Sequence, residues 1–79
     1  MENKELNEKM LEVIKIIDKR KLITANEISE MSGISYITVQ KYLNELKNEG
    51  IVIEALEDKS QGKIKRYSLN YKYLHSKED

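Results

Sequence analysis

Apolar residues recur at helical spacing in three stretches of the chain, and in a fourth stretch they follow the spacing of strands. In the first stretch, residues 3–19, the recurring apolar positions form one stripe of a long helix: Leu6, Met10, Val13, Ile14 and Ile17. Leu11 and Ile16 widen this apolar surface beyond what a thin domain needs. The cations at positions 19–21 are favourable against the C-terminal helix dipole and predict the end of the helix there.

The second stretch predicts a helix of two turns with its own start and stop signals. Thr24 and Glu27 have the spacing of a capping box, in which each side chain accepts a hydrogen bond from a backbone N–H at the helix start. Ile23 and Ile28 flank the box as a hydrophobic staple, and residues 22–23 are expected to form a short strand before it. Ile28 and Met31 would share the apolar face, and the residues at 32–33 end the helix because glycine accepts the left-handed conformation.

The third stretch predicts another helix immediately afterwards. Ser35 is its expected N-cap, Ile34 is placed to pack on Val39, and Gly50 is the expected C-terminal stop. Its buried face follows the i, i+4, i+7 pattern: Val39, Leu43 and Leu46. The opposite face carries mostly polar side chains: Ile37, Gln40, Lys41, Asn44 and Asn48. Only this second face would be free to meet a ligand.

The fourth stretch predicts a β-hairpin, with strands at 51–56 and 64–69 and a polar turn at 57–63. Ile51, Ile53 and Ala55 would share one face of the first strand, and Tyr67 and Leu69 one face of the second. Ile64 does not share their parity, which predicts either a β-bulge or a twist of the hairpin away from the core.

Length and charge limit the choice of class. A chain of 79 residues with equal numbers of cationic and anionic side chains has a formal net charge of +0, and a chain of this size builds one small domain with a marginal core. It has no cysteine, so disulfides and thiolate metal sites are excluded. With no membrane-length apolar run and no apolar signal segment, a cytoplasmic protein is expected.

Charge is distributed unevenly along the chain. Residues 59–72 contain cations and no acidic residue: Lys59, Lys63, Lys65, Arg66 and Lys72. The hairpin is therefore expected to carry a positive field, although such a run is also typical of an ordinary solvated surface.

The ordered pattern LITANEISEMSGISYITVQKYLNELKNEGIV resembles the winged helix-turn-helix domain of small bacterial and archaeal transcription regulators, and the resemblance extends over roughly residues 10–69. It implies an α+β fold of three helices with a small antiparallel β-hairpin wing. In that family the second helix of the pair enters the major groove, and the wing reaches the flanking backbone or the minor groove. The resemblance therefore implies sequence-specific binding of double-stranded DNA by a transcription regulator.

Candidate DNA-binding residues lie on the second helix of the pair and on the wing. The amides of Gln40 and Asn44 suit adenine, Lys41 suits guanine or phosphate, and Ile37 and Thr38 suit a thymine methyl group. Tyr36, just inside the helix start, is a candidate for a phosphate contact beside the free backbone N–H groups there, and the N-cap Ser35 is also a candidate DNA-binding residue. The wing candidates are Lys59, Lys63, Lys65 and Arg66. For each of these residues, a solvated surface role is the competing interpretation.

Catalysis is not expected, because the single histidine, His75, lies near the chain end and there is neither a cysteine nucleophile nor a glycine-rich phosphate loop. No cofactor or metal is predicted, and an effector site stays open. The whole chain, 1–79, is expected to be one domain, with a dimerising N-terminal helix extension (1–9) and a C-terminal tail (70–79).

Two further expectations concern partners. A homodimer is expected from the spare apolar surface at Leu6, Leu11, Ile16 and Leu74; Tyr71, Tyr73 and Leu74 would cover either the domain's own core or a second subunit. The alternative to DNA binding is a winged helix that binds protein in a transcription or replication assembly, which the neutral net charge, Ile37, Glu45 and Glu49 favour.

Overall fold

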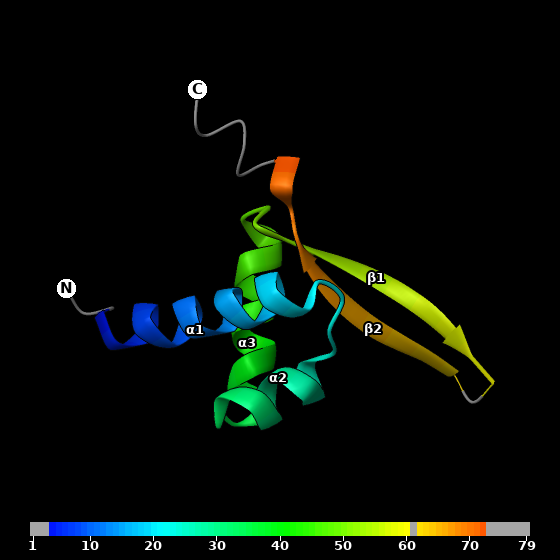
Figure 1. Cartoon of the computed structure of the whole chain (residues 1–79), viewed down its shortest axis with the longest axis horizontal. Coiled ribbons are helices and arrows are strands. Elements are labelled where there is room, and N and C mark those ends of the chain that lie inside the picture. The colour runs from blue at the N-terminus through cyan, green and yellow to red at the C-terminus, as the bar shows by residue number, and fades with distance from the viewer. Residues whose placement is uncertain (1–3, 61, 73–79) are drawn as a thin grey trace.

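The computed structural model describes residues 4–60 and 62–72 and has three helices followed by a β-hairpin. The elements, in chain order, are α1 (Lys4–Arg20), α2 (Ala25–Ser32), α3 (Tyr36–Asn48), β1 (Val52–Lys59) and β2 (Gly62–Leu69). The helices are grouped together, and the far end of the antiparallel hairpin projects beyond them (Figure 1). The predicted α+β arrangement of three helices and an antiparallel wing is confirmed.

Helix α1 buries its apolar stripe against the rest of the domain. Val13 and Ile17 are buried, and Met10 and Ile14 pack at the edge of the core. Ile16 is also buried, so its assignment to spare apolar surface was wrong. The side chain of Leu6 lies outside the described residues, whereas Leu11 is 55% exposed. The stripe thus faces the core, and Leu11 is left on the outer surface.

The predicted capping box starts α2. The Glu27 backbone N–H donates to Thr24 Oγ1 at 3.1 Å, and the Thr24 N–H donates to Glu27 Oε1 at 3.1 Å. Ile28 is buried in the core. Gly33 has a φ of 80° and ends the helix, as predicted from its freedom to adopt this conformation. Met31 is 44% exposed, so the expectation that it shares the buried face was wrong.

Helix α3 follows after a short turn and supplies the largest share of the core. Ser35 is the N-cap, since its Oγ accepts a hydrogen bond from the Thr38 N–H at 3.3 Å. The predicted residues of the apolar face are buried, and Tyr42, which the apolar pattern did not include, is buried beside them. The helix has its C-cap at Glu49, and Gly50 then turns the chain with a φ of 81°.

The hairpin has an uninterrupted register from Val52 opposite Leu69 to Lys59 opposite Gly62. The prediction of a bulge near Ile64 is therefore wrong. The distal half of the hairpin instead extends away from the helices (Figure 1). The strands are longer than predicted because residues 57–59 and 62–63, assigned to the turn on polarity, pair across the hairpin. Polar side chains fit these positions because the distal hairpin is open to water.

One end of the hairpin completes the core. On β1 the buried residue is Val52, whereas Ile53 and Ala55 are exposed; on β2 Tyr67 and Leu69 are buried. The segment before α2 forms a single bridge to β2 in place of a short strand, with Ile23 N–H donating to the Tyr67 carbonyl at 3.1 Å and Tyr67 N–H to the Ile23 carbonyl at 2.8 Å. This bridge ties the wing to the helix pair.

The chain after β2 packs against its own domain as far as it is described. The Tyr71 hydroxyl donates to Asp18 Oδ1 at 2.6 Å and accepts a hydrogen bond from Lys21 Nζ at 3.2 Å. Asn70 bonds back to the chain around Gly50 through its backbone and its side chain. Tyr73, Leu74 and His75 lie outside the described residues. Tyr71 is 40% exposed and is not part of the core, so it does not cover the core as one alternative expected; its pairing with a second subunit stays a prediction.

Candidate nucleic-acid interface

The outer face of α3 is exposed, as the sequence pattern predicted. Gln40, Lys41 and Asn44 are all exposed, and Ile37 is 79% exposed. The same helix anchors its other face in the core, so its backbone is held while these side chains project outward. A rigid helix with a free polar face can be inserted into a groove of DNA.

The side chains at the start of α3 are partly engaged with one another. The Ser35 hydroxyl donates to Thr38 Oγ1 at 3.0 Å in addition to capping the helix, and Thr38 is half-buried. Gln40 Nε2 donates to the Tyr36 hydroxyl at 2.9 Å. Tyr36 therefore orients the amide of Gln40, while Ser35 and Thr38 hold the helix start in place.

The wing is charged but not uniformly positive. Its two strands carry four cations and three carboxylates, and the carboxylates of β1 lie beside the cations. Lys65 Nζ lies 3.5 Å from Glu54 Oε2, and Lys63 Nζ lies 3.7 Å from Asp58 Oδ1. The expectation of a clean positive field on the wing was wrong, because the acidic residues that the sequence places before residue 59 fold back onto the basic run.

The register explains why these pairs form. Lys65 is opposite Leu56, so Glu54 is its diagonal neighbour on the same face of the hairpin. By the same geometry Arg66, opposite Ala55, lies diagonal to residue 57, and diagonal neighbours are within reach of long side chains. Arg66 Nε donates to Glu57 Oε1 at 2.6 Å, and Lys59 Nζ lies 3.5 Å from Glu57 Oε2.

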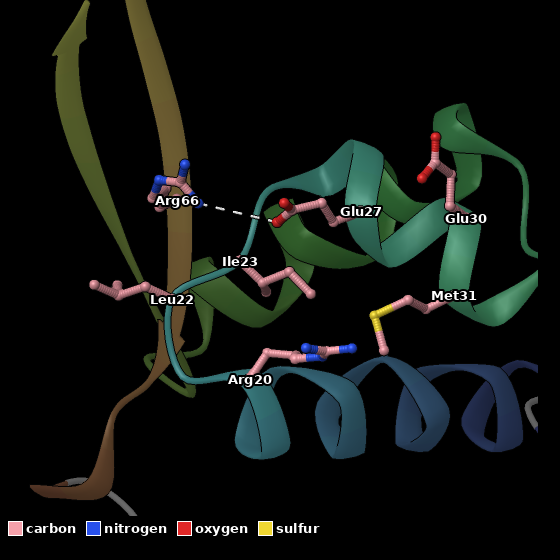
Figure 2. Close-up of a pocket in the computed structure, with 7 residues that line it drawn as sticks. All are labelled: Arg20, Leu22, Ile23, Glu27, Glu30, Met31 and Arg66. Atoms are coloured by element: carbon pink, nitrogen blue, oxygen red, sulfur yellow. Dashed lines mark ion pairs between the residues drawn. The ribbon is translucent and has the colours of Figure 1, made fainter.

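Two further ion pairs connect the wing to the helices. Lys47 Nζ, from the last turn of α3, donates to Glu54 Oε1 at 2.5 Å. Arg66 Nη1 lies 4.0 Å from Glu27 Oε1 on α2, and Figure 2 shows these two side chains pointing toward one another. Lys47 was not among the predicted site residues, although its spacing of three and seven residues from Asn44 and Gln40 places it on the same side of α3.

The cations beside Glu54 and Glu57 favour the charged form of each carboxyl group. The hydrogen bond from Lys47 is the main cause that lowers the pKa of Glu54, and the hydrogen bond from Arg66 is the main cause that lowers the pKa of Glu57. Partial burial opposes both shifts. Both carboxylates are therefore ionised at neutral pH and stay available to the neighbouring cations.

Two open cavities are lined both by the wing and by the helices. One, of about 520 Å³, separates the start of α3 from β2, and its lining includes Asn26, Tyr36 and Lys65. The other, of about 370 Å³, is shown in Figure 2 and is lined by Arg20, Leu22, Ile23, Glu27, Glu30, Met31 and Arg66. Glu27, Glu30 and Arg66 line both cavities, and each has one further cation, Lys65 in the first and Arg20 in the second, so neither offers net charge to an anionic ligand. The first lies between the two surfaces predicted to contact DNA.

The described part of the chain contains no group of three or more histidine, cysteine or acidic side chains placed to hold a metal ion. Within residues 4–60 and 62–72, no helix combines the length and the apolar character needed to span a membrane.

Comparison with known proteins identifies the class. Residues 6–53, more than half of the chain, match the family described as winged helix-turn-helix DNA-binding, and the chain belongs to this family. It is a DNA-binding domain of a kind that is not enzymatic. A search of curated proteins found no match.

A solved structure has the same fold. Stf76 from the Sulfolobus islandicus plasmid-virus pSSVx superposes with a TM-score of 0.71, at 18% sequence identity, and the alignment covers 90% of this chain and 94% of that one. The likeness extends over both the helices and the wing, since it covers nearly all of each chain.

Proposed function

We propose that this protein is a small transcription regulator, folded as one domain, that binds double-stranded DNA in a sequence-specific manner with α3 in the major groove. The observation that carries the proposal is the exposed, amide-bearing face of α3, held beside a wing in a chain of the DNA-binding family. Gln40 and Asn44 lie one helical turn apart on this face, so both amides can reach neighbouring base pairs.

The side chains of α3 have separate roles in this proposal. Gln40 and Asn44 read adenine through paired hydrogen bonds, and Lys41 donates to guanine or to phosphate. Ile37 contacts a thymine methyl group, which suits its high exposure. Tyr36 fixes the position of Gln40 through the hydrogen bond between them and contributes to a phosphate contact at the helix start.

The wing cations supplement this readout on the flanking backbone. Lys59, Lys63, Lys65 and Arg66 each have a neighbouring carboxylate in the free protein. Each cation therefore contributes less to phosphate binding than a cation with no neighbouring carboxylate would. The proposal accordingly assigns most of the discrimination to α3 and a modest electrostatic share to the wing.

A titration of DNA binding over salt concentration tests the proposal. The protein is mixed with labelled genomic duplex fragments, and binding is followed by gel shift or fluorescence anisotropy from about 50 to 200 mM salt. Phosphate contacts release counterions, so the affinity is expected to fall as salt rises. No binding at the lowest salt, or an affinity that does not change with salt, would contradict DNA binding.

A protein-binding role is the second candidate, and the exposed apolar side chains favour it. Ile37 on α3 and Ile53 and Leu56 on β1 are exposed, and the wing charges are largely neutralised by their neighbours. In this case the parent protein would bind DNA only weakly. Ile37→Asn would then abolish binding of the protein partner and leave the weak affinity for DNA unchanged. Under the DNA-binding proposal the same change alters sequence preference.

We also propose that two copies associate through the outer side of α1. An apolar groove of about 430 Å³ runs between α1 and the end of α3, with a lining that includes Met10, Leu11, Ile14, Leu46 and Ile51. Leu11 is exposed at its edge. Covering this groove would bury apolar surface that one domain leaves in water. Sedimentation is expected to show a dimer at micromolar concentration that Leu11→Glu converts to a monomer; a monomeric parent protein would rule this out.

A further inference from the structure

Glu54 lies at the junction between the proposed reading helix and the wing. Its side chain is only 16% exposed and accepts a hydrogen bond from Lys47 of α3, while Lys65 of β2 lies within ion-pair distance of its other oxygen. One carboxylate thus holds two cations from two different elements. Both cations belong to surfaces that, in the proposed function, face the DNA.

Glu57 has the equivalent position on the opposite face of the hairpin. It accepts a hydrogen bond from Arg66 and forms an ion pair with Lys59. The donors in these contacts are the ammonium and guanidinium groups that would bind phosphate, and a carboxylate presents anionic oxygens of the same kind as a phosphate. DNA must therefore displace these carboxylates, or share the cations with them, before the wing can grip the backbone.

We propose that Glu54 and Glu57 compete with DNA phosphates for Lys47, Lys65 and Arg66, and that this competition weakens binding to non-cognate DNA and so increases sequence discrimination. The inference rests on the proposed function. Non-specific binding comes almost entirely from phosphate contacts, so withholding cations reduces it. The base contacts of Gln40 and Asn44 do not involve these carboxylates and are retained on the preferred site.

This competition gives the neutral composition of the chain a role. A DNA-binding module gains affinity for every sequence from surplus positive charge, because the phosphate backbone is the same everywhere. The wing strands here have a surplus of only one cation. The pairing is also specific, since the strand register and the position of α3 place particular cations beside each carboxylate.

The test compares Glu54→Gln with Glu12→Gln, which has the same change in net charge. Glu12 is exposed on α1, does not line the apolar groove, and forms no ion pair within the described part of the chain. Affinity for a duplex without a preferred site is measured as a function of salt. Glu54→Gln is expected to steepen the slope of log affinity against log salt by about 1 to 2 and to raise affinity roughly tenfold at 0.1 M salt.

The control variant is expected to change affinity by about twofold or less, because an exposed charge away from the contact surface is screened. Equal effects of the two substitutions would overturn the proposal. Circular dichroism verifies that each variant is folded. Glu57→Gln provides a second, more exposed site, at which release of Arg66 is expected to produce the same steepening.

A double-mutant cycle with Lys65 gives an independent readout. In the parent protein Lys65 is paired with Glu54, so Lys65→Gln is expected to flatten the slope of log affinity against log salt only slightly. In the Glu54→Gln background Lys65 makes a full phosphate contact, and Lys65→Gln is expected to flatten the slope by about 0.9. Equal losses in both backgrounds would show that the two residues act independently and would overturn the inference. If neither the parent nor Glu54→Gln binds DNA, the proposed function fails as well. If the parent binds and the variants behave alike, only the inference fails.

Discussion

The Gln40→Ala variant tests the base contacts of α3 separately from protein stability and from sequence-independent DNA binding. Gln40 is exposed and donates a hydrogen bond to Tyr36, and alanine is at least as favourable inside a helix. The free energy of unfolding should therefore change by no more than about 0.5 kcal/mol. Loss of a bidentate contact to adenine costs about 1–3 kcal/mol, which corresponds to about a fivefold to 150-fold loss of affinity on the preferred site.

The assay requires two duplexes, a preferred site taken from selection out of a random pool and a shuffled duplex of the same composition. Gln40→Ala is expected to weaken binding to the first and leave binding to the second nearly unchanged. Lys65→Gln is the matched comparison and should weaken both duplexes by the same factor, because phosphates carry no sequence information. If Gln40→Ala weakened both duplexes equally, the assignment of base reading to this face would be refuted.

Two further predictions concern the fold. Ile28→Ala removes a side chain with no exposed area from the centre of the helix pair, and should lower the free energy of unfolding by about 2–5 kcal/mol in a urea titration; a loss below about 1 kcal/mol would contradict the packing described. Acid should destabilise the wing junction: the folded-state pKa of Glu54 lies below its ordinary value of 4.5 because Lys47 donates to it, so its stabilising contribution is present above that value and is lost as pH falls through the folded-state pKa. Unfolding titrations between pH 6 and pH 3 should show a shallower acid loss for Glu54→Gln, and identical pH profiles would count against the pair.

Local signals in the sequence were sufficient for the helix pair. The capping box at Thr24, the left-handed glycine at position 33 and the Ser35 cap each depend on residues within a few positions of one another, and each is present. The exposed face of α3 followed in the same way from the period of its apolar residues. These features are local, so no knowledge of tertiary packing was needed to predict them.

Features that depend on tertiary contacts were missed or misjudged. Met31 has the spacing of a core residue but lies at the rim of a cavity, and Ile16 fills the core although it was assigned to the outer surface. Tyr42 was overlooked because a tyrosine between buried positions gives no clear apolar signal. In each case the neighbours that decide burial come from other elements of the chain.

The charge of the wing could be judged only from the strand register. In the sequence, the basic run from Lys59 onward is separate from Glu54 and Glu57, and a count along the chain gives a positive segment. The antiparallel pairing places the two groups side by side, and α3 adds Lys47 from a third element. The DNA-contact role of the candidate residues stays a prediction.

The most direct test of the account is amide chemical-shift mapping of the ¹⁵N-labelled protein, titrated with a duplex that contains its selected site. We expect the largest changes on the outer face of α3, around Gln40 and Asn44, and smaller changes along β2. Changes confined to α1 and the groove beside Leu11, with α3 unaffected, would contradict the claim that α3 reads DNA.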